Sequence, residues 1–159
     1  MPINHDELET LLNRYWSVLV AWVGGKRDGA EDWVQAAFIK LAAEEPPPKN
    51  CVAWLFTVTK RLAVNDQVAQ AKRRSREKQA VDRSSRPADP CHDFEMRDLL
   101  DQLEPREREI VIAKIWGGLT FDEISSLYRE PKASLWRTYQ SGLEKLKHIY
   151  GKAEYESSP

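Results

Sequence analysis

Basic side chains of this 159-residue chain are concentrated in one short segment. Between Lys60 and Lys78 there are seven Lys and Arg residues against Asp66 and Glu77, a local excess of five, although the formal net charge of the whole chain is −1. Lys and Arg that neutralise nucleic-acid phosphates release counterions, which strengthens binding at low salt. The segment therefore indicates a local phosphate contact, but a charge run beside a linker also fits an ordinary solvated surface.

A second group of polar and aromatic residues lies near the start of the expected last helix. If Leu135, Tyr139 and Leu143 face a core, the outward residues are Lys132, Ser134, Trp136, Arg137, Gln140 and Ser141. In a helix-turn-helix the start of the second helix enters the major groove, where Arg pairs with guanine and Gln with adenine. A two-helix corner that only packs, with Trp136 against a neighbour, has the same spacing, so both interpretations stay open.

Groups suited to catalysis are sparse. The histidines His5, His92 and His148 are scattered, and no carboxylate pair has a nearby partner. The glycine pairs at 24–25 and 117–118 are typical of helix ends rather than of a phosphate-binding loop. The sequence therefore argues against an enzyme.

The cysteines do not indicate a metal site or a disulfide framework. Cys51 and Cys91 are far apart, and Cys91 with its neighbour His92 supplies too few ligands for a metal. The acidic start MPINHDELET is unlike a signal peptide, and no apolar run approaches the roughly 18 residues of a membrane span. We expect a reduced, cytoplasmic protein with no cofactor, no metal and no membrane span.

Three amphipathic helices are predicted in the first half of the chain. Apolar residues recur at three- and four-residue steps over 7–23, 30–45 and 50–78. Pro46 to Pro48 end the second helix, because proline lacks a donor and its preceding residue avoids the helical region. Asn50 is suited to cap the third.

A second helical unit is predicted after a linker. Residues 81–93, VDRSSRPADPCHD, have almost no apolar content. A short helix over 94–103 follows, and then REREIVIAKIW, with Pro105 in its first turn and Gly117 and Gly118 closing it.

The end of the second unit is predicted to be a helix-turn-helix. Thr120 and Glu123 have the spacing of a capping box, with Leu119 and Ile124 placed as its hydrophobic staple. That helix lasts to about 128, and Pro131 suits the start of a longer one. The predicted fold is all-α: two small helical domains joined by a flexible linker, the second containing the helix-turn-helix.

Three stretches carry a resemblance to a known family. They are AEDWVQAAFIKLA at 30–42, VAWLFTVTKRLAVNDQVAQAKRRSRE at 52–77 and LEPREREIVIAKIWGGLTFDEI at 103–124. In this order they resemble the sigma-70 family of bacterial RNA polymerase initiation factors, in particular the two-domain extracytoplasmic-function (ECF) group. The tract IWGGLTFDEI is similar to a subset known chiefly from planctomycete-type bacteria. The resemblance covers about residues 7–150.

The resemblance implies a division of labour along the chain. Residues 1–80 would form the domain that binds core RNA polymerase, at its beta-prime clamp helices, and the −10 promoter element. Residues 81–93 would be the linker. Residues 94–159 would bind the −35 element and the polymerase beta flap. Members of the group are commonly held inactive by an anti-sigma partner, so an anti-sigma factor is a further expected partner, beside core polymerase and promoter DNA.

Site residues can be carried over from the resemblance in the first domain. A polymerase-contact motif similar to D-x-x-Q-E-x-F falls on Asp32, Gln35, Ala36 and Phe38, and Glu31 adds to its acidic surface. Acids at a helix start also suit the helix dipole, whatever they contact. The promoter-opening segment implies −10 DNA contacts by Trp54, Lys60, Arg61, Asn65, Lys72, Arg73 and Arg74. Trp54 also fits a core position, among Leu55 and Val58.

Several positions depart from the family pattern. Ala36 replaces a usual Glu, and Arg61 and Asn65 replace the Asn and Asp of the promoter-opening segment. In the second domain Thr138 replaces a second Arg, and Arg129 replaces the turn glycine, which predicts a different turn geometry. The predicted −35 contacts are Lys132, Ser134, Trp136, Arg137, Gln140 and Ser141. These departures leave a second hypothesis open: a sigma-like regulator that binds polymerase or a regulator without sequence-specific initiation.

Overall fold

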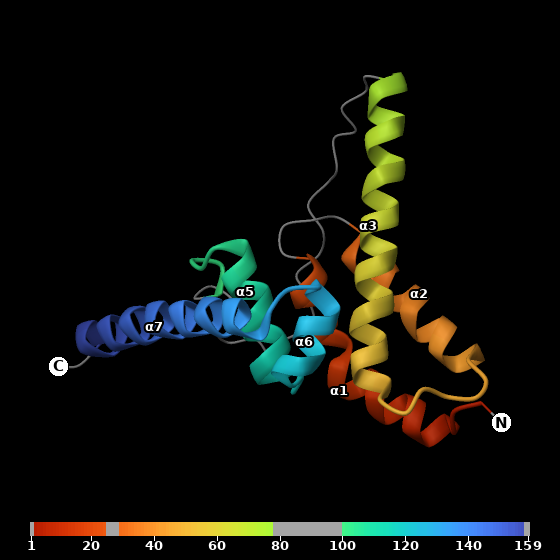
Figure 1. Cartoon of the computed structure of the whole chain (residues 1–159), viewed down its shortest axis with the longest axis horizontal. Helices are drawn as coiled ribbons and strands as arrows, with labels where there is room; N and C mark the ends of the chain where they lie inside the picture. Colours follow the sequence, from red (N-terminus) through yellow and green to blue (C-terminus); the bar gives the residue numbers. More distant parts are fainter. Residues whose placement is uncertain (1, 25–28, 78–99, 158–159) are drawn as a thin grey trace.

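Three helices form the first unit of the structure, which is a computed structural model describing residues 2–24, 29–77 and 100–157. They are α1 (His5–Gly24), α2 (Ala30–Ala43) and α3 (Cys51–Glu77), and the three helices lie against one another (Figure 1). Their apolar stripes form the contact. Leu19, Val34, Leu41 and Leu55 are completely buried between them.

The boundaries of these helices agree with the predicted ones to within two residues. Asn50 caps α3 as expected, because its Oδ1 accepts the Ala53 amide at 3.1 Å. The second helix ends at Ala43 rather than at 45, since Glu44 is already extended with a ψ of 129°. The predicted linker 81–93 and most of the predicted helix over 94–103 lie outside the described residues.

The second unit contains α5 (Pro105–Val111), η1 (Ile112–Trp116), α6 (Phe121–Tyr128) and α7 (Lys132–Ser157). Pro105 occupies the first turn of α5 as predicted. The segment predicted as one regular helix instead ends in the wider π-turn η1, where the Gly117 amide donates to the Ile112 carbonyl at 2.9 Å. Gly117 lies so close to Phe56 of α3 that a Cβ would be 2.7 Å from its ring. This tertiary contact has no local signal in the sequence.

The helix-turn-helix is formed by α6 and α7. Its predicted capping box is present, with the Glu123 amide donating to Thr120 Oγ1 at 3.1 Å and the Thr120 amide donating to Glu123 Oε1 at 2.9 Å. Leu119 and Ile124 are both buried.

The turn between α6 and α7 corrects one prediction. Arg129 adopts a φ of 55° and a ψ of 47°, the left-handed conformation that glycine would take. The arginine therefore retains the geometry of a glycine turn. Two hydrogen bonds hold this turn: the Glu130 amide donates to the Ser125 carbonyl, and the Ser125 hydroxyl donates to the Glu130 carbonyl.

Replacing Arg129 with glycine should stabilise the protein, because a left-handed non-glycine residue costs roughly 1 kcal/mol or more. We expect a rise of about 1 kcal/mol in the free energy of unfolding, measured by urea denaturation. Arg129→Ala is the control: it removes the same side chain but keeps the strain, so it should not stabilise. Equal stabilisation by alanine and glycine would contradict the strain argument.

The two units share one apolar core. Contacts join α1 to α5 and η1, and α3 to α6. Trp22 of α1 meets Phe56 of α3 edge-on at a centroid distance of 4.7 Å, and Gly117 packs on the same Phe56 ring. Beyond this shared region α3 and α7 project in different directions (Figure 1). The two surfaces that are candidates for binding nucleic acid therefore lie on α3 and on α7.

Candidate polymerase and nucleic-acid interface

The start of α7 presents a polar and aromatic surface. Leu135 is completely buried and fixes the helix face that points inward. Lys132, Trp136 and Arg137 are exposed, and Trp136 keeps 52% of its surface accessible. Ser134 and Gln140 are partly exposed. The alternative that Trp136 packs on a neighbour does not hold in this structure, because half of its surface is accessible. Exposing this much of an indole to water costs hydrophobic free energy.

Ser141 departs from its predicted role. Its hydroxyl donates to Glu107 Oε2 of α5 at 2.6 Å instead of pointing to solvent. The reason is the close approach of the two helices at Gly142, where a Cβ would meet Val111 Cγ2 at 2.9 Å. This contact between α5 and α7 directs Ser141 inward, so we leave it out of the proposed DNA contacts.

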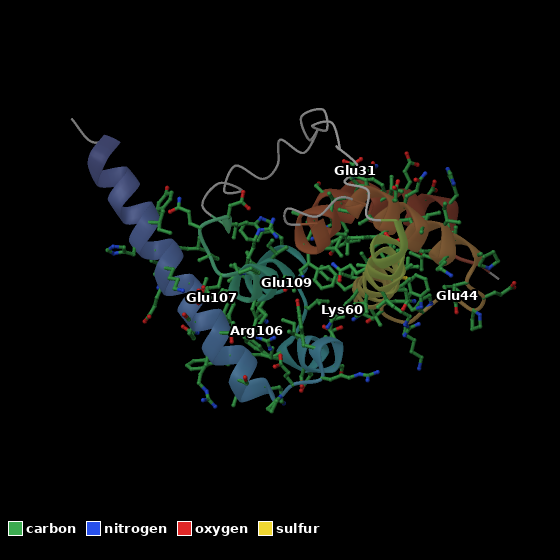
Figure 2. The ribbon with its side chains drawn as sticks, turned by 90° about the horizontal axis from the view of Figure 1, so that it is seen from above. Glu31, Glu44, Lys60, Arg106, Glu107 and Glu109 are labelled. Atoms are coloured by element: carbon green, nitrogen blue, oxygen red, sulfur yellow. The ribbon has the colours of Figure 1, made fainter. Side chains whose placement is uncertain are left out.

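Glu107 ties α5 to α7. Only 7% of Glu107 is exposed, and Oε1 accepts from Lys145 Nζ at 2.9 Å and from the Glu104 amide at 3.2 Å. Burial raises the pKa of the Glu107 carboxyl, but the hydrogen bonds from Ser141, Lys145 and the Glu104 amide outweigh it, so the pKa is lowered overall. In Figure 2 Glu107 lies beside α7.

Acidic residues of α2 form the candidate polymerase surface. Glu31, Asp32 and Gln35 are exposed, and Figure 2 shows Glu31 on a side of the first unit that faces away from α6. Phe38, predicted with them, is instead 4% exposed, with its ring 6.2 Å from that of Trp16. As a large apolar side chain on the inner face of α2 it supports the core, so we remove it from the direct contacts.

The candidate −10 residues of α3 are placed differently from one another. Arg61 and Asn65 are exposed, whereas Trp54 is partly buried against the core, as its alternative core position predicted. The side chains of Lys72, Arg73 and Arg74 lie outside the described residues. Lys60 is directed at the second unit, where its Nζ donates to the Leu127 carbonyl at 3.0 Å and lies 4.1 Å above the Tyr128 ring.

Residues of the contact between the units were missed by sequence reasoning. Trp22 Nε1 donates to the Tyr128 hydroxyl at 3.1 Å, and Arg108 donates to the Ala21 carbonyl at 2.7 Å. These partners are about a hundred residues apart in the sequence, and no local pattern could have paired them. Burial raises the pKa of the Tyr128 hydroxyl. Burial also lowers the pKa of the Lys60 ammonium; the nearby charges of Arg106 and Arg129 lower this pKa further, whereas the charge of Glu109 raises it.

Comparison with known proteins identifies the family. No protein-family model matches the chain. The chain is 32% identical over 136 residues to the RNA polymerase sigma factor CarQ of Myxococcus xanthus, which covers 80% of this chain and 78% of CarQ. This chain belongs to the RNA polymerase sigma factors.

Comparison with solved structures also finds a sigma factor of the same fold. The sigma factor RpoE of Bartonella quintana, solved with the anti-sigma factor NepR, superposes with a TM-score of 0.64 at 17% identity, over 92% of this chain and 95% of RpoE. At that identity the likeness concerns the fold alone, and it agrees with the predicted all-α, two-unit architecture. The relationship to CarQ carries the function: the protein is an ECF-type sigma factor that directs transcription initiation with RNA polymerase, and it is not an enzyme.

The described part of the sigma factor has neither a metal-binding cluster nor a membrane-spanning helix. Residues 2–24, 29–77 and 100–157 contain no group of three or more His, Cys, Asp and Glu residues that could hold a metal ion. Over the same part of the chain, no helix combines the length and the apolar character that crossing a membrane requires.

The Glu107 contact predicts an acid-dependent stability of the sigma factor. A carboxyl whose folded pKa is lowered stabilises the fold above its unfolded pKa, near 4.5, and loses that contribution as the pH falls through the folded pKa. Glu107→Gln should therefore lower the melting temperature at neutral pH, and the difference from the parent should shrink on acidification. Thermal unfolding measured at a series of pH values tests this. A difference that is constant at all pH values would contradict it.

Proposed function

We propose that this sigma factor recognises a two-part promoter through the surfaces described above. Residues 1–80 form the domain for core polymerase and the −10 element, 81–93 the linker, and 94–159 the domain for the −35 element. The supporting observation is the capped helix-turn-helix of α6 and α7, whose second helix begins with exposed Trp136 and Arg137. Within RNA polymerase sigma factors, such a surface suits duplex DNA.

The start of α7 supplies the −35 contacts. Lys132 would reach a phosphate, and Arg137 and Gln140 have the donors that pair with guanine and adenine in the major groove. Trp136 would gain cover from the DNA backbone or a thymine methyl, which offsets the cost of its exposure. Ser134 is partly exposed beside them and offers a hydroxyl for the same surface. The same unit would also contact the beta flap of polymerase.

The first domain supplies the polymerase and −10 contacts. Glu31, Asp32 and Gln35 form an acidic, hydrogen-bonding edge of α2 that suits basic residues of the beta-prime clamp helices. Lys60, Arg61 and Asn65 on α3, followed by the basic run that includes Lys72, Arg73 and Arg74, would contact the −10 element. The partly buried Trp54 would stack on an unpaired base only through its exposed part.

We also propose how the sigma factor is regulated and where it is located. The similar RpoE of Bartonella quintana was solved with an anti-sigma factor, and we propose that a protein of this kind also controls the present chain. The sigma factor itself would act in the cytoplasm, where RNA polymerase transcribes DNA. The proposed membership of the planctomycete-type subset rests on the tract IWGGLTFDEI alone.

Co-purification with core RNA polymerase, followed by sequencing of the retained DNA, tests the proposal. Retained fragments should share a motif in two parts separated by a spacer of constant length. Chains with Arg137→Ala should lose the preference at one base of the upstream part of the motif, and chains with Arg61→Ala should lose preference within the downstream part. Polymerase binding without any shared motif would reject the proposed promoter contacts and would favour the sigma-like regulator. An absence of polymerase binding would reject the proposed surface on α2.

A further inference from the structure

The second half of α3 leaves the core of the first unit. Ala63 is buried, but residues 64–69 are exposed, including the apolar Val64 and Val68, and the one exception in this range is the half-buried Asp66. Figure 1 shows this half of the helix extending beyond α2. Apolar packing therefore does not fix the direction of the outer half of α3 (64–77), which carries the basic run.

A hydrogen bond ties Asp66 to α2. Trp33 Nε1 donates to Asp66 Oδ2 at 2.8 Å, and Trp33 is 6% exposed. A buried indole N–H needs an acceptor, and a carboxylate makes a stronger bond than a neutral oxygen does. Asp66 is also an acid within a basic segment, where an outward carboxylate would repel phosphates. Its bond to Trp33 gives this carboxylate a partner inside the protein.

The indole of Trp33 is itself held in one place. Gly29, which precedes α2, has a φ of 100°, a left-handed conformation that favours glycine. A Cβ on Gly29 would lie 3.2 Å from Cζ2 of the indole, so the backbone packs directly on the ring. The Trp33 amide also donates to the Gly29 carbonyl at 3.0 Å. These contacts fix the indole N–H at the start of α2.

Each of the two bonded residues is next to a proposed functional surface. Trp33 follows Asp32, an exposed residue of the acidic edge that we propose for polymerase. Asp66 follows Asn65, which is exposed and proposed to contact the −10 element. Consecutive residues of a helix share one turn. The bond therefore joins the turn of α2 that would meet polymerase to the turn of α3 that would meet DNA.

We infer that Trp33 and Asp66 are positioning residues, whose hydrogen bond sets the direction of the outer half of α3 relative to α2 and so aligns the −10 contacts with bound polymerase. This inference rests on the proposed function, because it needs α2 to contact polymerase and α3 to contact the −10 element. Without the bond the outer half of α3 would sample several directions, and promoter opening would have to select one of them. Polymerase binding should not change, since the exposed edge of α2 stays the same.

Promoter opening by the sigma factor with core polymerase tests the inference. The probe is the promoter DNA that co-purifies with the parent complex, and the permanganate reactivity of unpaired thymines follows the opening of its −10 element. Asp66→Ala should open this element about tenfold more slowly than the parent, the effect of one charge-assisted hydrogen bond. Asp66→Asn removes the same charge but keeps an oxygen acceptor for the indole, so it should retain most of the parent's rate.

Trp33→Phe tests the same bond from the side of the donor. It removes the indole N–H and should slow opening as much as Asp66→Ala does. The two substitutions together should slow opening no more than either one alone, because both remove a single interaction. Independent, multiplying effects of the two substitutions would overturn the inference.

Two readouts separate positioning from a loss of folded protein. The Asp66→Ala protein should bind core polymerase as tightly as the parent does. A template whose −10 element is already open, because its strands are mismatched there, should restore transcription to the parent's level. A merely less folded protein would bind polymerase more weakly and would gain nothing from the open template, and either result would overturn the positioning role.

Arg61→Ala in the same assay tells failure of the inference from failure of the proposed function. Slow opening by Arg61→Ala with parental opening by Asp66→Ala would overturn the positioning role and leave the proposed −10 contacts intact. Parental opening by both proteins would reject the −10 contacts as well. An Asp66→Asn protein as slow as Asp66→Ala would also overturn the inference, because charge rather than the hydrogen bond would then control opening.

The direction of α3 can also be measured without polymerase or DNA. Spin labels at Lys40→Cys of α2 and Ala69→Cys of α3, both exposed positions, report the distance between the two helices when Cys51→Ser and Cys91→Ser remove the native thiols. Electron paramagnetic resonance should give a narrow distance distribution for the otherwise unchanged protein and for Asp66→Asn, and a broader one for Asp66→Ala. Equal distributions in all three proteins would overturn the inference.

Discussion

Replacing Phe56 with alanine should lower the free energy of unfolding by about 3–5 kcal/mol. Phe56 is completely buried, its ring meets Trp22 edge-on at 4.7 Å, and the Gly117 backbone packs directly on it. Alanine would leave a cavity at the point where the two units share their core. Loss of the ring should therefore destabilise the fold and also weaken the contact between the units.

Urea denaturation followed by circular dichroism measures this effect. Val64→Ala is the matched control: Val64 lies on the same helix but is 47% exposed, so its loss should cost less than about 0.5 kcal/mol. Phe56→Leu should fall between the two, because leucine fills part of the volume. A cost below about 1 kcal/mol for Phe56→Ala would show that the units do not depend on this packing.

Replacing Arg137 with alanine should weaken promoter binding by the polymerase complex about 10- to 100-fold. This follows from the roughly 1–3 kcal/mol that a bidentate pair of arginine with guanine contributes to discrimination between bases. Arg137 is exposed on the first part of α7, beside Trp136, and its Nε donates to the Ala133 carbonyl of its own helix at a long 3.4 Å. Its loss should not change the stability of the fold by more than about 0.5 kcal/mol.

The measurement is the dissociation constant for promoter duplexes at one fixed salt concentration, with every base substituted in turn at one upstream position. Lys147→Ala, an exposed basic residue further along the same helix, removes the same charge and is the control. The Arg137 variant should lose discrimination at one base position, whereas the Lys147 variant should weaken all sequences equally and slightly. Equal and uniform losses in the two variants would contradict base reading by Arg137.

Some features of the protein were predictable because their causes are local. The capping box of Thr120 and Glu123, the cap at Asn50 and the proline in the first turn of α5 each depend on groups within a few residues of one another. Helical periodicity likewise predicted which face of α7 is inward, since Leu135 is buried while Trp136 and Arg137 are exposed. The family resemblance then indicated which of these exposed residues are relevant to DNA.

The sequence by itself thus determined the helices, their caps and the ordered motifs of a sigma factor. Only the tertiary structure decided that Ser141 bonds Glu107. It also decided that Lys60 meets Tyr128. The physical reason is separation along the chain: the partners of Ser141 and Lys60 are 34 and 67 or more residues away, so their contacts arise only when whole helices pack, beyond the few residues that periodicity and capping report.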